Sequence, residues 1–172
     1  MATAFRCEDG AVRAEIGAEE RGLILALIAD LSGLVAPDAV SDPLGLGLLN
    51  DAALSADPVM ARLLPNAYVD DEEASAEFRR LTEHGLRTRK AEALDSMRAT
   101  LLADHLVLDS DQSRAWLAGL NDLRLSIGTR IGLADDGAEA PSDAVVALYD
   151  WLTWMQDCLI DAITRCADTL TP

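Results

Sequence analysis

The sequence is poor in aromatic residues and has no long hydrophobic runs. Half of its 172 residues are hydrophobic, but only three Trp, two Tyr and two Phe are present. A core built mainly from Leu, Ala, Ile and Val favours helices over strands. No hydrophobic run approaches the ~20 residues of a membrane-spanning helix, and the N-terminus lacks the basic start and apolar block of a secretory signal. We therefore expect a cytoplasmic protein without a membrane partner.

Positive charge is also scarce. The chain has 14 Lys and Arg against 30 Asp and Glu, a formal net charge of −16, and Lys90 is its one lysine. Proteins that bind DNA neutralise the phosphates with Lys and Arg, so a field of this sign opposes direct contact with nucleic acid. We therefore expect no direct binding of nucleic acid, and the same charge favours solubility.

Sequence motifs for catalysis, phosphate binding and metal binding are absent. There is no GxSxG, no HExxH, no glycine-rich phosphate loop and no dinucleotide fingerprint. The three cysteines include no CxxC pair, and neither His84 nor His105 has a partner at ligand spacing. We therefore predict no enzymatic activity, no catalytic residue, no cofactor and no metal.

Helix signals account for most of the chain. Helices are expected at about 18–35, 58–64, 71–102, 111–131 and 142–169, and the expected capping residues are Asp57, Asp70 or Asp71, Ser110 and Ser142. Before them, Asp9-Gly10 divides an alternating segment at about 4–16 into a β-hairpin. The sequence thus predicts a mainly α fold, a single helical domain over 1–172. Its architecture would be an irregular bundle of about five helices with a short N-terminal β-hairpin.

Two of these helices carry apolar faces that we expect to pack. In the first helix the expected core stripe is Leu23, Leu27, Ile28, Leu31 and Leu34. In the last helix Tyr149, Trp151, Trp154 and Met155 are expected at the edge of the core, where they could also support a homodimer. The segments at about 36–57 and 134–141 are rich in Pro, Gly and Asp, and we expect mobile loops there.

The cysteines limit which disulfide can form. Cys158 and Cys166 are eight positions apart on the expected last helix, which places their Cα atoms ~12 Å apart. A disulfide tolerates at most ~7 Å between Cα atoms. An intramolecular bond must therefore use Cys7, whose hairpin could lie against the last helix. The alternative is that Cys7, Cys158 and Cys166 are inert thiols.

A basic cluster lies on the long third helix, where it has two interpretations. It consists of Arg79, Arg80, Arg87, Arg89, Lys90 and Arg98, and all but Arg89 project within roughly a 100° arc. The functional interpretation is an electropositive stripe for an acidic partner or a phosphate. The favoured alternative is pairing with nearby Glu83 and Glu92 and with the acidic remainder of the chain.

Polar residues also interrupt the apolar fourth helix. Asn121, Asp122 and Arg124 need partners there, because an unpaired buried charge is very unfavourable. They indicate either a structural network, tied to Glu77 or to the Arg62 helix, or a polar pocket between helices. The full candidate set is Arg62, Tyr68, Glu77, Arg79, Asn121, Asp122, Arg124 and Arg130.

Three segments, at 57–79, 120–130 and 149–156, together resemble a known family. They include Arg62-Leu63-Leu64-Pro65-Asn66-Ala67-Tyr68, Leu120-Asn121-Asp122-Leu123-Arg124-Leu125 and Tyr149-Asp150-Trp151-Leu152. In order and spacing they resemble an actinobacterial family of unknown function that includes the AosR-like oxidative-stress transcriptional regulators. The match spans nearly the whole chain, and the cysteines lie outside the three segments or at their edge.

The resemblance implies an all-helical cytoplasmic regulator linked to stress and thiol oxidation. It also implies action through protein–protein contacts, with a sigma factor or another part of the transcription machinery as the partner. The family has no motif-anchored active site, so no catalytic residue carries over. The alternatives are a helical module that binds a small-molecule effector, and an adaptor linked to Clp-type proteolysis.

Overall fold

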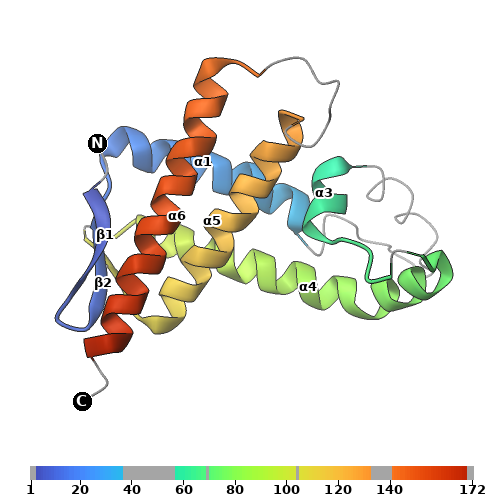
Figure 1. Ribbon diagram of the computed structural model, residues 1–172, viewed down its shortest axis with the longest axis horizontal. Helices are drawn as coiled ribbons and strands as arrows, with labels where there is room; N and C mark the ends of the chain where they lie inside the picture. Colours follow the sequence, from blue (N-terminus) through green and yellow to red (C-terminus); the bar gives the residue numbers. More distant parts are fainter. Residues whose placement is uncertain (1–2, 37–56, 69, 104, 133–140, 170–172) are drawn as a thin grey trace.

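The computed structural model describes residues 3–36, 57–68, 70–103, 105–132 and 141–169 (Figure 1). The helices in these ranges are α1 (Ala18–Val35), α3 (Pro58–Leu63), α4 (Glu72–Leu101), α5 (Ser110–Arg130) and α6 (Asp143–Thr169). The strands are β1 (Thr3–Glu8), β2 (Ala11–Glu15) and β3 (Leu106–Leu108). The predicted fold class, mainly helical with an N-terminal hairpin, is confirmed. The expected loops at about 36–57 and 134–141 lie almost wholly outside the described residues.

The hairpin forms at the predicted dipeptide. Asp9 and Gly10 have φ angles of 53° and 75°, and two positive φ angles in a row make the tight turn that suits the twist of two antiparallel strands. Cys7 then lies opposite Val12, and Glu8 lies opposite Ala11.

A third strand, β3, was not predicted. It pairs antiparallel with β2, so that the sheet has the order β1-β2-β3. Leu106 and Leu108 face the core, while Val107 is more than one-third exposed. Three residues are too short a segment for an alternating pattern to be recognised in the sequence.

Capping residues fix the helix starts. Asp57 accepts hydrogen bonds from the backbone N–H of Val59 and Met60, and Asp71 accepts one from that of Ala74. The expected cap of α5 was wrong, because Asp109 and not Ser110 caps it. Asp109 accepts from the Gln112 N–H at 2.8 Å, and the Gln112 side chain accepts from the Asp109 N–H at 3.0 Å. This reciprocal pair is a capping box, which satisfies two backbone donors at once.

The core centres on a buried tryptophan between the sheet and the helices. Trp116 of α5 is fully buried, its ring meets that of Phe5 edge-on at 5.5 Å, and its Nε1 donates to Thr100 Oγ1 at 2.7 Å. The hairpin, α4 and α5 therefore share one core.

The expected stripe on α1 is confirmed for Ile28 and Leu31, which are buried, and for Leu27 and Leu34, which pack partly buried against the core; it was wrong for Leu23. The buried residues are Ile24, Ile28, Leu31 and Val35, and Leu23 is 41% exposed. Most of α1 is apolar on every side, so the pattern alone did not distinguish the packed face.

The first strand and the last helix pack against each other. α5 packs against α3, α4 and α6, and β1 packs along α6. Figure 1 shows the hairpin beside the C-terminal half of α6, with the start of α4 at the opposite side of the molecule. Among the residues that the structure describes, no helix combines the length and hydrophobicity needed to cross a membrane.

Candidate functional site: a disulfide between the hairpin and the last helix

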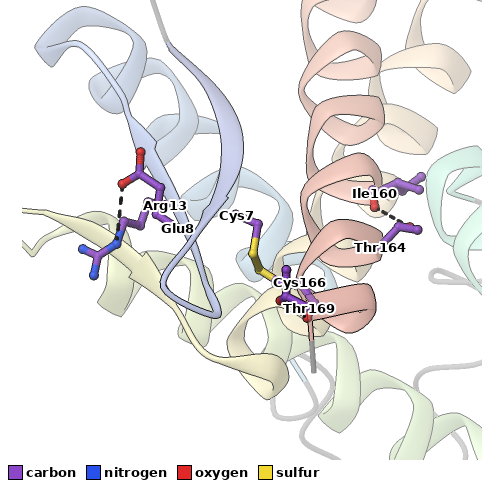
Figure 2. Close-up of a disulfide and its surroundings, with 7 residues drawn as sticks. All are labelled: Cys7, Glu8, Arg13, Ile160, Thr164, Cys166 and Thr169. Atoms are coloured by element: carbon purple, nitrogen blue, oxygen red, sulfur yellow. Dashed lines mark hydrogen bonds and ion pairs between the residues drawn. A yellow bond between two sulfur atoms is a disulfide. The ribbon is translucent and has the colours of Figure 1, made fainter. Parts of the chain in front are cut away.

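Cys7 and Cys166 form a disulfide in the structure (Figure 2). Cys7 is on β1 and Cys166 is in the last turn of α6, so the bond joins residues 159 positions apart in the chain. Their Cα atoms are 5.4 Å apart, within the usual range for a disulfide. Of the two partners that the sequence left open for Cys7, the structure pairs it with Cys166.

The packing of β1 on α6 brings the two sulfur atoms together. α6 is continuous from Asp143 to Thr169, so Cys158 and Cys166 stay two turns apart on the same helix. Cys166 is buried, and Cys7 is partly buried against the core. Thr169 Oγ1 donates to the Cys166 carbonyl at 2.8 Å, next to the disulfide. The bond thus closes an interface that side-chain packing already defines.

Ion pairs on the hairpin join its strands to each other. Glu8 pairs with Arg6 and with Arg13, the latter at 3.8 Å, and Arg6 also lies 3.5 Å from Glu15. All of these groups are substantially exposed, and exposed ion pairs contribute little to stability. Within the described residues, the hairpin is therefore held on α6 by apolar packing and by the disulfide.

Cys158, unlike Cys7 and Cys166, is a free thiol in the structure. It is partly buried on α6 and is not bonded to another cysteine. Burial raises the pKa of its thiol, and the carboxylates of Asp161 and Asp157 raise it further. Since the thiolate is the reactive form, Cys158 is poorly suited to react with oxidants.

Arg124 lies between α5 and α6, where it takes part in a polar network. Its Nη1 donates to Gln156 Oε1 at 2.5 Å and its Nη2 to the Tyr149 hydroxyl at 3.4 Å, with the guanidinium 5.2 Å from the centre of the Tyr149 ring. Its Nε is buried without an acceptor. The expected tie to Glu77 or to the Arg62 helix was wrong, because the facing helix is α6.

Asn121 and Asp122 lie on the side of α5 that faces α4. Asp122 is buried and accepts two hydrogen bonds from Lys90 Nζ of α4, at 2.8 and 3.0 Å. Both residues line a cavity of about 300 Å³ between the two helices. We call it the α4–α5 groove, and its lining residues are Leu86, Arg89, Lys90, Ala93, Ala118, Asn121 and Asp122.

The remaining candidate residues lie apart from both the Arg124 network and the α4–α5 groove. Arg62 is exposed on α3, and the exposed Tyr68 ring meets that of Phe78 edge-on at 6.3 Å. Arg79 donates to Asn66. Two further ion pairs join Glu77 to Arg80 at 2.8 Å and Arg130 to Asp30 of α1 at 2.6 Å, and Arg80 lowers the pKa of the Glu77 carboxyl. The eight candidate residues therefore do not form one site.

Most of the basic cluster is neutralised. Each of Arg80, Arg87, Lys90 and Arg98 has a carboxylate partner within 3 Å, namely Glu77, Glu83, Asp122 and Asp95. The favoured interpretation, pairing, therefore describes the cluster better than an electropositive stripe does. Arg89 differs, because no described residue pairs with it and it lines the α4–α5 groove.

Comparison with known proteins establishes the family. The model of a domain of unknown function, DUF2017, matches residues 2–163. This chain belongs to the DUF2017 family. The matched range includes Cys7 and Cys158 and ends before Cys166.

Among its relatives, this DUF2017 protein is 27% identical over 159 residues to the oxidative stress regulator AosR of Mycobacterium tuberculosis, covering 81% of this chain and 72% of that protein. The figures are the same for the regulator of that name from Mycobacterium bovis. No solved structure matches the chain significantly.

Sequence reasoning missed the groups that Arg124 and Asp122 contact. Tyr149 and Gln156 were visible in the third segment of the family resemblance, but nothing in a single sequence pairs that segment with Arg124. Lys90 was assigned to a basic cluster on its own helix, although its partner lies 32 positions further along the chain. In both cases the missing information was which faces of neighbouring helices meet.

Proposed function

We propose that this DUF2017 protein is an oxidative-stress regulator that acts through protein contacts, with the Cys7–Cys166 pair as its redox switch. The observation that carries the proposal is the disulfide itself, which fastens the N-terminal hairpin to the end of the last helix. The name of the mycobacterial relatives, oxidative stress regulator, supports the same assignment. A cytoplasmic location strengthens it, because thiols there are normally kept reduced and a disulfide reports oxidation.

The switch chemistry consumes one hydrogen peroxide. Cys7 is the less buried of the pair, so its thiol takes the oxygen first and becomes a sulfenic acid, releasing one water. The Cys166 sulfur then attacks the Cys7 sulfur, forming the disulfide and releasing a second water. Two thiols are oxidised and one peroxide is reduced to two waters. Cys158 stays out of the reaction because it lies two turns away from Cys166 on the continuous α6, while Cys7 is placed against Cys166.

The state of the disulfide changes the surface that the protein offers. When it is closed, β1 covers its part of α6 and the three-stranded sheet is held in place. When it is open, the hairpin is held by packing and by the pairing of β2 with β3, while β1 has no covalent tie to α6, so α6 can be uncovered. A preorganised surface binds more tightly than one that must first be ordered, so the oxidised form is the binding form.

The partner is a protein of the transcription machinery, such as a sigma factor, as the resemblance to the AosR-like regulators suggests. The net charge of −16 favours a partner with a basic face and opposes duplex DNA. Pairing of most of the α4 cations with carboxylates removes the main candidate for a phosphate-binding surface.

The test is a binding titration with purified sigma factors, using oxidised and reduced wild type, Cys166→Ser and the control Cys158→Ser. One sigma factor should bind oxidised wild type at least about tenfold more tightly than the reduced form, a difference of roughly 1.4 kcal/mol. Cys158→Ser should respond to oxidation like the wild type, and Cys166→Ser should not respond. Equal affinities in both redox states, or a response that survives Cys166→Ser, would refute the switch. Binding to duplex DNA alone would refute the choice of partner.

A further inference from the structure

The α4–α5 groove has the features of a binding site that the disulfide does not use. It lies between two helices that face each other, and its volume of about 300 Å³ is at the lower end of the range for small-molecule sites. Leu86, Ala93 and Ala118 supply its apolar part, and the polar groups stand beside them. An apolar surface with a few polar groups is the usual composition of such a site.

The charges in the groove do not balance. Lys90 and Asp122 neutralise each other, since Lys90 Nζ lies 2.8 Å from one carboxylate oxygen of Asp122 and 3.0 Å from the other. Arg89 remains, exposed and without a carboxylate or any other partner among the described residues. The groove therefore carries one uncompensated positive charge in a chain whose net charge is −16.

Hydrogen-bond donors in the groove are also unused. A lysine ammonium has three N–H groups, and Lys90 directs two hydrogen bonds to Asp122, which leaves one. None of the five guanidinium donors of Arg89 has an acceptor among the described residues, and neither does the amide of Asn121. The three side chains together offer donors and a positive charge next to an apolar wall.

We propose that the α4–α5 groove binds a small organic carboxylate. Its carboxylate group pairs with the Arg89 guanidinium, a geometry in which two parallel hydrogen bonds form, and Asn121 donates to it as well. Its short hydrocarbon body lies on Leu86, Ala93 and Ala118. The site is independent of the Cys7–Cys166 switch, so either proposal can fail while the other stands.

The acidic surface of the protein does not prevent this binding. Charges separated by more than the Debye length, about 8 Å at physiological ionic strength, are largely screened, so the neighbouring guanidinium outweighs the distant carboxylates. The buried carboxylate of Asp122 already has its counter-ion in Lys90. A ligand carboxylate in the groove therefore meets an unpaired cation.

The experiment follows backbone amide NMR shifts of the full chain, and heats of binding, during titration with a series of carboxylates from acetate to adipate. Inorganic phosphate and sodium chloride at matched ionic strength are the comparison anions. One of the carboxylates should give saturable shifts confined to the facing parts of α4 and α5. Arg89→Gln should weaken that binding about tenfold or more, as expected when a charged hydrogen-bond partner is lost.

Two further variants distinguish a site from a general charge effect. Arg98→Gln removes an exposed arginine of the same helix that is paired with Asp95, and should leave the affinity unchanged. Ala118→Glu places a tethered carboxylate in the groove, and should abolish binding. The proposal is overturned if no carboxylate gives saturable shifts at the groove, if Arg89→Gln binds as well as wild type, or if phosphate binds more tightly than every carboxylate.

Discussion

Opening the Cys7–Cys166 disulfide should destabilise the fold by several kcal/mol. The bond closes a loop of 159 positions. In the chain-entropy model a loop of that length restricts the unfolded chain by about 5 kcal/mol, and measured disulfides more often contribute about 2–4 kcal/mol. A loss of about 3 kcal/mol would lower the melting temperature of a chain of this size by about 6–12 °C.

Urea denaturation of oxidised and reduced protein measures this effect. Reduction should lower the unfolding midpoint of wild type and of Cys158→Ser by the same amount. Cys166→Ser should unfold at the midpoint of reduced wild type, with or without reductant. If reductant destabilises Cys166→Ser as much as wild type, or leaves the wild type unchanged, the reasoning from loop closure is wrong for this chain.

Four further predictions concern positions away from the disulfide. Iodoacetamide labelling of Cys158 should reach half its maximal rate at a pH above the ordinary cysteine pKa, because burial and two neighbouring carboxylates disfavour the thiolate; a midpoint at or below the ordinary value would contradict this. Gly85→Ala, in open space on α4, should stabilise by about 0.5–1 kcal/mol in urea denaturation. Gly119→Ala should instead destabilise by about 1–3 kcal/mol, because the new Cβ would clash with the buried side chain of Met97 on α4. A gain like that of Gly85→Ala would show that α4 and α5 separate easily. Lys90→Met should cost about 2–3 kcal/mol by leaving the buried Asp122 carboxylate unpaired, and a change below about 0.5 kcal/mol would show that the pair contributes little.

The sequence predicted the helices well because their ends carry chemical signals. Asp57 before Pro58 and Asp71 before two glutamates specified two helix starts, and Asp9-Gly10 specified the hairpin turn. The predictions that failed were those that depend on contacts between segments distant in the sequence. β3 was missed because it is a strand only through its pairing with β2. On α1 the prediction included the exposed Leu23 and missed the buried Ile24 and Val35, because that helix is apolar on nearly every side.

For the candidate site, too, local geometry could be predicted from the sequence, whereas contacts between distant segments could not. A distance along an ideal helix excluded a bond between Cys158 and Cys166, and this left Cys7 as the necessary partner. The choice of Cys166 depends on where β1 meets α6, which no local pattern contains. Arg124 was correctly assigned a need for partners, but its partners come from α6, and the eight polar candidates lie in separate places.

The most direct test of the switch is intact mass and thiol counting on the full chain after mild peroxide, in wild type and in Cys7→Ser. Wild type should lose two thiols within a monomer, regain them with reductant, and leave Cys158 as the thiol that iodoacetamide labels after denaturation. Cys7→Ser should form no intramolecular crosslink. Three free thiols throughout, or a crosslink that contains Cys158, would contradict the assignment of Cys7 and Cys166 as the redox pair.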